Sequence, residues 1–215
     1  MKQATAISLC ALVLLGAAGC ASRQSLQHQI WQQHVKMVQS INRESCVAGC
    51  YAFEGDSNME LINFQEYFAE PACNYAHRGS TTADVLARKE KISDLKPSLI
   101  VVLVGGNDVV QSVSEDTIVT NYVELIGFYR SICDRVYCIS NLPVKTGLSI
   151  TSSTMSHLNG RLEKTCRRLG ATFINVFPSL YKNGGLNPDY AIDPVHLNKE
   201  GQDVVMDIVK KQLAK

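Results

Sequence analysis

Ser57 and His196 are the two side chains whose sequence context best suits covalent chemistry. Ser57 follows Gly55 and Asp56 at the end of an apolar segment, and a serine exposed at such a turn becomes a nucleophile when a base removes its proton. His196 stands three residues after Asp193, so the carboxylate can accept from one imidazole nitrogen and leave the other free as that base. Each signal taken alone is also typical of a surface turn or a helix cap.

Two further segments carry donors for the negative charge of a tetrahedral intermediate. Gly79 permits close approach of the backbone, and an N–H at that turn could face an oxyanion. One of the hydroxyl residues at 80–82 is expected to cap the helix that follows. Asn107 follows two glycines, and its amide NH₂ would be a fixed donor at a sheet edge. Both segments are equally typical of ordinary turns.

The elements that position these segments are predicted to alternate between strand and helix. The apolar run 99–104 is typical of a strand buried on both faces. The other predicted strands are 51–53, 72–77, 135–140 and 171–176. The predicted helices are 81–91, 116–132, 156–169 and a C-terminal helix that includes 204–213. Such alternation implies an open, mostly parallel sheet whose ligand-binding groups gather at the carboxyl ends of the strands. Without an internal repeat or linker, residues 46–215 are predicted to form one domain.

The four segments, in this order, resemble the sequence blocks of the SGNH hydrolases, also called GDSL esterases and lipases. The resemblance extends over about residues 50–210. The stretch Asp193-Pro194-Val195-His196-Leu197-Asn198-Lys199-Glu200-Gly201 is particularly typical of that family. The resemblance implies an α/β fold, namely a flavodoxin-like three-layer αβα sandwich with a mostly parallel five-stranded sheet. It also implies that the first strand lies between the second and the third.

Roles for individual residues also follow from the resemblance. It implies that Ser57 is the nucleophile, that His196 is the general base and later the acid, and that Asp193 orients His196. The backbone N–H groups of Ser57 and Gly79 and the Asn107 side chain would form the oxyanion hole. The family's reaction needs no metal and no organic cofactor.

Three features that the sequence lacks restrict the possible functions. The sequence has no G-x-S-x-G motif, which excludes the nucleophile elbow of the α/β-hydrolases. No histidine pair has the i,i+4 spacing of a zinc-binding helix. The formal net charge of +1 argues against nucleic-acid binding, for which a basic excess is typical.

Two residues depart from the family's pattern. Ala76 stands where a glycine is frequent, and Asn58 follows the serine at a position that varies. We expect both to reshape the acyl pocket without removing a catalytic atom.

The expected activity is hydrolysis of a carboxylic ester through an acyl-serine intermediate. O-acetyl esters of carbohydrates are the first substrate expected, by resemblance to small members of the family. A lysophospholipase or thioesterase acting on lipid acyl groups is the alternative with the same chemistry. A non-catalytic envelope binding lipoprotein is the alternative from another class.

The N-terminus predicts export. Lys2 precedes an apolar run over 4–18, shorter than the about 20 residues of a membrane-spanning helix, so residues 1–19 are predicted to be a signal peptide. The ending at Cys20 resembles a lipobox, which implies lipidation of Cys20 and an outer-membrane lipoprotein of the cell envelope; an ordinary cleaved signal is the alternative. Residues 20–45 would then be the lipidated N-terminus with an amphipathic helix, which packs on the domain or serves as a stalk or partner-binding helix.

Six cysteines remain in the exported chain, and an oxidising compartment favours disulfides among them. Cys73 is expected to pair with Cys46 or Cys50. Cys166 is expected to pair with Cys133 or Cys138, or to be a buried free thiol, because it shares a helix face with leucines. A zinc site at Cys46 and Cys50 would lack a second ligand pair at suitable spacing.

Overall fold

The computed structural model describes Lys36, Ser40 and residues 46–215. The predicted signal peptide, Cys20 and nearly all of the predicted N-terminal helix lie outside the described residues. Among the described residues, no helix combines the length and the apolar character needed to cross a membrane.

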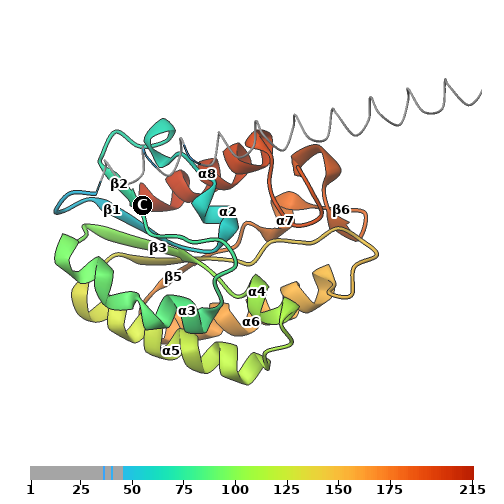
Figure 1. Ribbon diagram of the computed structural model, residues 1–215, viewed down its shortest axis with the longest axis horizontal. Coiled ribbons are helices and arrows are strands. Elements are labelled where there is room, and N and C mark those ends of the chain that lie inside the picture. Colours follow the sequence, from blue (N-terminus) through green and yellow to red (C-terminus); the bar gives the residue numbers. More distant parts are fainter. Residues whose placement is uncertain (1–35, 37–39, 41–45) are drawn as a thin grey trace, which may run out of the picture. The chain divides into compact units, whose positions relative to one another are not determined.

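A five-stranded parallel sheet forms the centre of the domain (Figure 1). The spatial order is β2-β1-β3-β4-β5, and every neighbouring pair is parallel. β1 therefore lies between β2 and β3, which confirms the predicted fold class and strand order. The strands are β1 (Tyr51–Gly55), β2 (Ala72–Asn74), β3 (Leu99–Leu103), β4 (Val136–Ile139) and β5 (Thr172–Ile174).

Helices cover both faces of this sheet and form the outer layers (Figure 1). Side chains of β3 alternate between the two faces: Val101 belongs to one apolar core and Val102 to the other. One face packs against α2 (Ser57–Glu60), α7 (Phe177–Leu180) and α8 (Lys199–Leu213). The opposite face packs against α3 (Thr82–Ala87), α5 (Glu115–Ile132) and α6 (Ser152–Arg168).

Short elements that the sequence pattern did not predict connect this framework. They are α4 (Gly106–Val110), the 3₁₀ helices η1 (Phe64–Glu66), η2 (Lys89–Leu95) and η3 (Pro188–Tyr190), and the antiparallel pair β6 (Tyr181–Lys182) and β7 (Gly185–Leu186). β2 and β5 have three residues each and are shorter than the predicted segments.

Two predicted helix boundaries are wrong. The helix predicted over 81–91 divides at Arg88, whose backbone leaves the helical region and whose side chain turns to β1, so that α3 gives way to η2. Helix α6 begins at Ser152, four residues earlier than predicted, because the Thr151 side chain caps it in a stretch without apolar periodicity.

The cysteine predictions are confirmed in part. Cys46 and Cys73 form a disulfide, so Cys46 rather than Cys50 is the partner of Cys73. The predicted pairing of Cys166 with Cys133 or Cys138 is wrong, because all three are free and buried, as is Cys50. Cys138 of β4 and Cys166 of α6 contact each other as thiols within one apolar core, which makes Cys166 the buried free thiol of the alternative expectation.

Candidate active site

Ser57, His196 and Asp193 form a continuous series of hydrogen bonds at the carboxyl edge of the sheet. Ser57 Oγ lies 2.8 Å from His196 Nε2, and His196 Nδ1 lies 2.6 Å from Asp193 Oδ2. A neutral imidazole that donates from Nδ1 to the carboxylate leaves Nε2 to accept from the serine hydroxyl. The structure thus brings together three residues that span 139 positions of the chain in the order that proton removal from a serine requires.

The Asp193 carboxylate is held by the turn on which His196 stands. Its Oδ1 atom accepts from the backbone N–H groups of Val195 at 2.9 Å and His196 at 2.8 Å, while Oδ2 faces the imidazole. Burial alone would raise the pKa of Asp193, but these backbone hydrogen bonds and the one from His196 outweigh it and hold the pKa below its ordinary value. Asp193 is therefore a charged acceptor that fixes the ring orientation.

A sharp turn after β1 presents Ser57. Gly55 has φ +152°, and a Cβ at this position would lie 2.1 Å from the carbonyl oxygen of Leu103, so only glycine fits beside β3. Asp56 then caps α2, because its Oδ1 accepts from the N–H of Asn58 at 3.0 Å. These two residues place Ser57 at the first position of α2, facing the loop of His196.

Asn58 links the nucleophile's helix to the loop of the histidine. Its Nδ2 donates to the carbonyl of Val195 at 3.2 Å, and its Oδ1 accepts from the N–H of Leu197 at 3.3 Å. The two bonds bracket His196 on both sides, so the Asn58 amide helps to set the distance between His196 and Ser57. The sequence pattern predicted a role for Asn58 only in the acyl pocket, although its position directly after the serine was a signal for a role beside the nucleophile.

One pocket, of about 120 Å³, opens beside Ser57 Oγ. Ser57, His196 and Asn107 all line it, together with Asp56 and Asn58. The rest of its wall is mainly apolar and comes from the end of β3, the segments after β3 and β4, and the start of α6. The apolar side chains are Leu103, Val110, Leu142, Pro143, Val144, Ile150 and Met155, and Asn141 is a polar one among them. Such a wall suits the acyl part of an ester.

Only some of the candidate oxyanion-hole residues line the pocket. Asn107, in α4, lines the pocket and donates from Nδ2 to the carbonyl of Ser80 at 3.0 Å, which leaves its second amide hydrogen for a ligand. Gly79 adopts φ +74° in the adjacent turn and is not among the pocket-lining residues. The neighbouring Thr81, one of three candidate caps, is the N-cap of α3.

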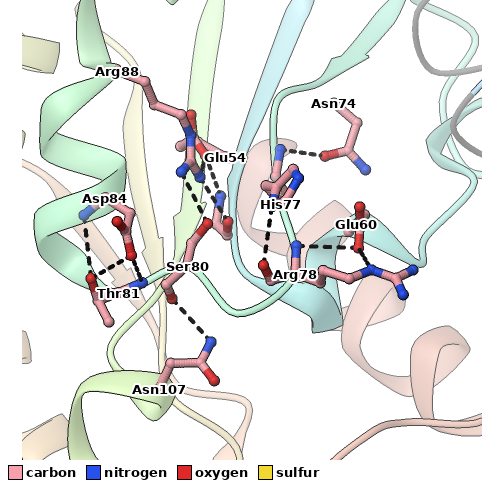
Figure 2. A network of polar contacts seen from close by, with 12 residues as sticks. Glu54, Glu60, Asn74, His77, Arg78, Ser80, Thr81, Asp84, Arg88 and Asn107 are labelled. Atoms are coloured by element: carbon pink, nitrogen blue, oxygen red, sulfur yellow. Dashed lines mark hydrogen bonds and ion pairs between the residues drawn. The ribbon is translucent and has the colours of Figure 1, made fainter. Parts of the chain in front are cut away.

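Buried carboxyl groups surround the nucleophile's turn. Burial raises the pKa of Asp56 to about 6, against hydrogen bonding from the Asn58 N–H and the attraction of His196. Burial likewise raises the pKa of Glu54 to about 6, although Arg88 beside it acts in the opposite direction. Figure 2 shows that Glu54 and Arg88 belong to a polar network that reaches Ser80 and Asn107. No sequence pattern predicted a role for Glu54 or Arg88.

Among the described residues, no group of three or more His, Cys, Asp or Glu side chains lies close enough to hold a metal ion.

The chain matches one family model and is similar in fold to several solved structures. No curated relative matches the chain. A GDSL-like lipase from Bacteroides thetaiotaomicron is similar in structure, with a TM-score of 0.71 at 21% identity over 87% of this chain and 96% of that one. An acetylxylan esterase from Geobacillus stearothermophilus has a TM-score of 0.66 at 15% identity over 80% of this chain and 97% of that one. The model of the GDSL-like lipase/acylhydrolase family matches residues 45–204. The chain belongs to that family and is an ester-hydrolysing enzyme.

Proposed function

We propose that this protein is an exported serine esterase that cleaves short acyl esters through an acyl-serine intermediate. The observation that carries the proposal is the series of hydrogen bonds from Ser57 Oγ through His196 to Asp193. Ser57 and His196 line a pocket with a mainly apolar wall. A serine becomes nucleophilic only when an adjacent base accepts its proton, and Nε2 of His196 is within reach of that proton.

The proposed reaction has two balanced halves. Ser57 Oγ attacks the ester carbonyl while its proton passes to His196 Nε2, and the carbonyl oxygen becomes an oxyanion facing the Ser57 N–H and the free amide hydrogen of Asn107. When the intermediate collapses, the bond to the alcohol breaks and His196 gives the alcohol its proton. Water then attacks the acyl-serine while one of its protons passes to His196. When this second intermediate collapses, the bond to Ser57 Oγ breaks, His196 returns the proton to Oγ, and the carboxylic acid leaves.

Asp193 acts on both halves through His196. Its charge stabilises the imidazolium that forms each time His196 accepts a proton, and its bond to Nδ1 keeps Nε2 aimed at Ser57. Because the pKa of Asp193 is held below its ordinary value, this carboxylate stays charged across the neutral range.

O-acetyl esters of carbohydrates are the first substrate class proposed. The small pocket beside Ser57 suits a short acyl group, and one structurally similar protein is an acetylxylan esterase. The experiment measures acetate release from acetylated xylan and hydrolysis of nitrophenyl acetate by the wild type and by Ser57→Ala. We expect turnover that Ser57→Ala loses; equal turnover by the two proteins would refute the serine mechanism.

A lipid acyl hydrolase is the second candidate, and the apolar wall formed by residues such as Leu142, Val144 and Ile150 favours it. An acyl-length series of nitrophenyl esters distinguishes the two candidates. The acetyl-esterase proposal predicts that kcat/KM falls as the acyl chain lengthens from two to eight carbons. Much faster cleavage of the eight-carbon ester would instead support a lysophospholipase or thioesterase.

A lipid anchor at Cys20 would hold the enzyme at the outer membrane. The support is the sequence of residues 1–20, which combines a basic start, an apolar run and a terminal cysteine. The intact mass of the membrane-extracted protein measures the lipid directly. If Cys20→Ala remains equally membrane-bound, this part of the proposal is wrong.

A further inference from the structure

An ion pair between the buried Glu54 and the partly buried Arg88 lies next to the turn that carries the nucleophile. Glu54 is in β1, three residues before Ser57, and its side chain is buried; Arg88 follows α3. Arg88 Nη2 donates to Glu54 Oε1 at 2.6 Å, and the same oxygen accepts from the backbone N–H of Gly55 at 2.9 Å. Burying the Glu54 carboxylate carries a large desolvation cost, which offsets much of the attraction between the two charges.

Two further hydrogen bonds from Arg88 join two segments of the candidate site (Figure 2). Nη1 donates to Ser80 Oγ at 2.9 Å, and Nη2 also donates to the carbonyl of Gly55 at 3.1 Å. That carbonyl accepts in addition from the N–H of His77 at 3.1 Å. The guanidinium therefore links the end of β1, which leads to Ser57, with the turn over 77–80.

The same turn holds the third segment of the site. The carbonyl of Ser80 accepts from Asn107 Nδ2 at 3.0 Å. Two residues further on, the N–H and hydroxyl of Thr82 donate to the buried Asp108 carboxylate at 2.8 and 2.6 Å. Ser80 is thus the residue through which Arg88 is connected to the amide of Asn107.

We propose that Arg88, held in place by Glu54, is a positioning residue that sets the spacing of the oxyanion-hole donors on the turns after β1, β2 and β3. The inference rests on the proposed serine-esterase function. Each segment carries one candidate donor: the N–H of Ser57, the N–H of Gly79 and the amide of Asn107. Such donors act fully only at hydrogen-bonding distance from the oxyanion, and the planar guanidinium fork holds its partners more rigidly than a lysine could.

The electrostatics agree with a role in positioning. Burial raises the pKa of Glu54 to about 6 even with Arg88 beside it, so keeping Glu54 charged at neutral pH opposes folding. An uncharged, apolar pair of similar volume would avoid that cost. The benefit of the charged pair then lies in the directed hydrogen bonds to Ser80 and Gly55.

The test uses full-length Arg88→Met, which keeps the side-chain stem and loses every donor. Nitrophenyl acetate gives kcat and KM, and phenylboronic acid reports on the oxyanion hole, because Ser57 Oγ adds to boron and forms a tetrahedral anion. We expect kcat to fall about 100-fold, the loss typical of a misplacement on the order of 1 Å. Boronate affinity should fall with it, while KM stays within about twofold because the ground-state contacts are unchanged.

Two further variants make the result specific. Ser80→Ala keeps the Glu54–Arg88 ion pair and removes a single hydrogen bond of Arg88, so we expect a smaller loss of kcat and of boronate affinity. If Arg88→Met does not fold, Ser80→Ala alone tests the positioning role. Arg161→Met removes two ion pairs that connect α6 with the first turn of α5, to Glu115 and Asp116, and should leave both quantities unchanged.

The outcomes separate this inference from the proposed function. If the wild type and Ser57→Ala have the same turnover, the serine mechanism fails and this inference fails with it. If turnover requires Ser57 but folded Arg88→Met and Ser80→Ala keep wild-type kcat and boronate affinity, only the positioning role is overturned. A lower kcat with unchanged boronate affinity would overturn it as well.

Discussion

Replacing Asp56 with asparagine should stabilise the protein at neutral pH. The Asp56 side chain is 4% exposed and caps α2 through Oδ1, and an asparagine can keep that acceptor. Burial raises the pKa of Asp56 from 3.8 to about 6, so the folded state holds its proton more tightly than the unfolded state does. The change removes a charge whose burial opposes folding.

The magnitude and its pH dependence follow from the same pKa. The native-state advantage of the protonated carboxyl is complete below about pH 4 and is lost as the pH rises to about 6, so stability falls across that window. At 1.36 kcal/mol per pKa unit, the loss amounts to about 3 kcal/mol above pH 6. Asp56→Asn should therefore exceed the wild type by up to about 3 kcal/mol at pH 8 and match it near pH 4.

Urea unfolding at a series of pH values between 4 and 8 measures this difference directly. Because groups such as Asp193 titrate alike in both proteins, their contributions cancel in the difference between the variant and the wild type. We also expect lower esterase activity, because the Asp56 charge attracts the charged form of His196. A difference in unfolding free energy that stays constant from pH 4 to pH 8 would refute the reasoning.

Three further changes have defined outcomes. Asn107→Ala should lower kcat by about 10²–10³-fold with little change in KM, because a transition-state donor is lost; steady-state kinetics on nitrophenyl acetate measures both, and a changed KM with unchanged kcat would contradict that role. Asn58→Ala should lower kcat by less than Ser57→Ala does, because His196 remains as the base but is less well placed. The same assay measures this, and a wild-type kcat would exclude a role of Asn58 in placing His196. Reducing the Cys46–Cys73 disulfide, which closes a separation of 27 residues, should lower the unfolding free energy by about 3–4 kcal/mol in denaturant titrations, and an unchanged midpoint would contradict it.

The framework of the fold was predictable because its signals are local. The apolar run that became β3 and the helical periodicity that became α8 are patterns within single segments, and their alternation restricts the chain to an open parallel sheet. The short elements were not predictable in this way. Helices of four or five residues such as α2 and α4 carry no periodicity, and they form because caps and glycine turns impose them.

The site was predictable as a set of residues and not as a geometry. The motifs named Ser57, Asp193 and His196 and the donor Asn107, and the structure brings all four to one edge of the sheet. The role of Asn58 in placing His196 was not predictable, because its partners lie 137 and 139 positions away, in a loop that no local pattern connects with it.

What the sequence determined by itself were residue types and local conformation: which strands are buried, where the turns fall, and which side chains could do chemistry. What only the tertiary structure decided was partnership across the chain. Cys73 pairs with Cys46 and not with Cys50, and Glu54 meets Arg88 from 34 residues away. The physical reason is that such contacts depend on which segments the sheet order makes neighbours, and side chains distant along the chain become neighbours only when β1 is placed between β2 and β3.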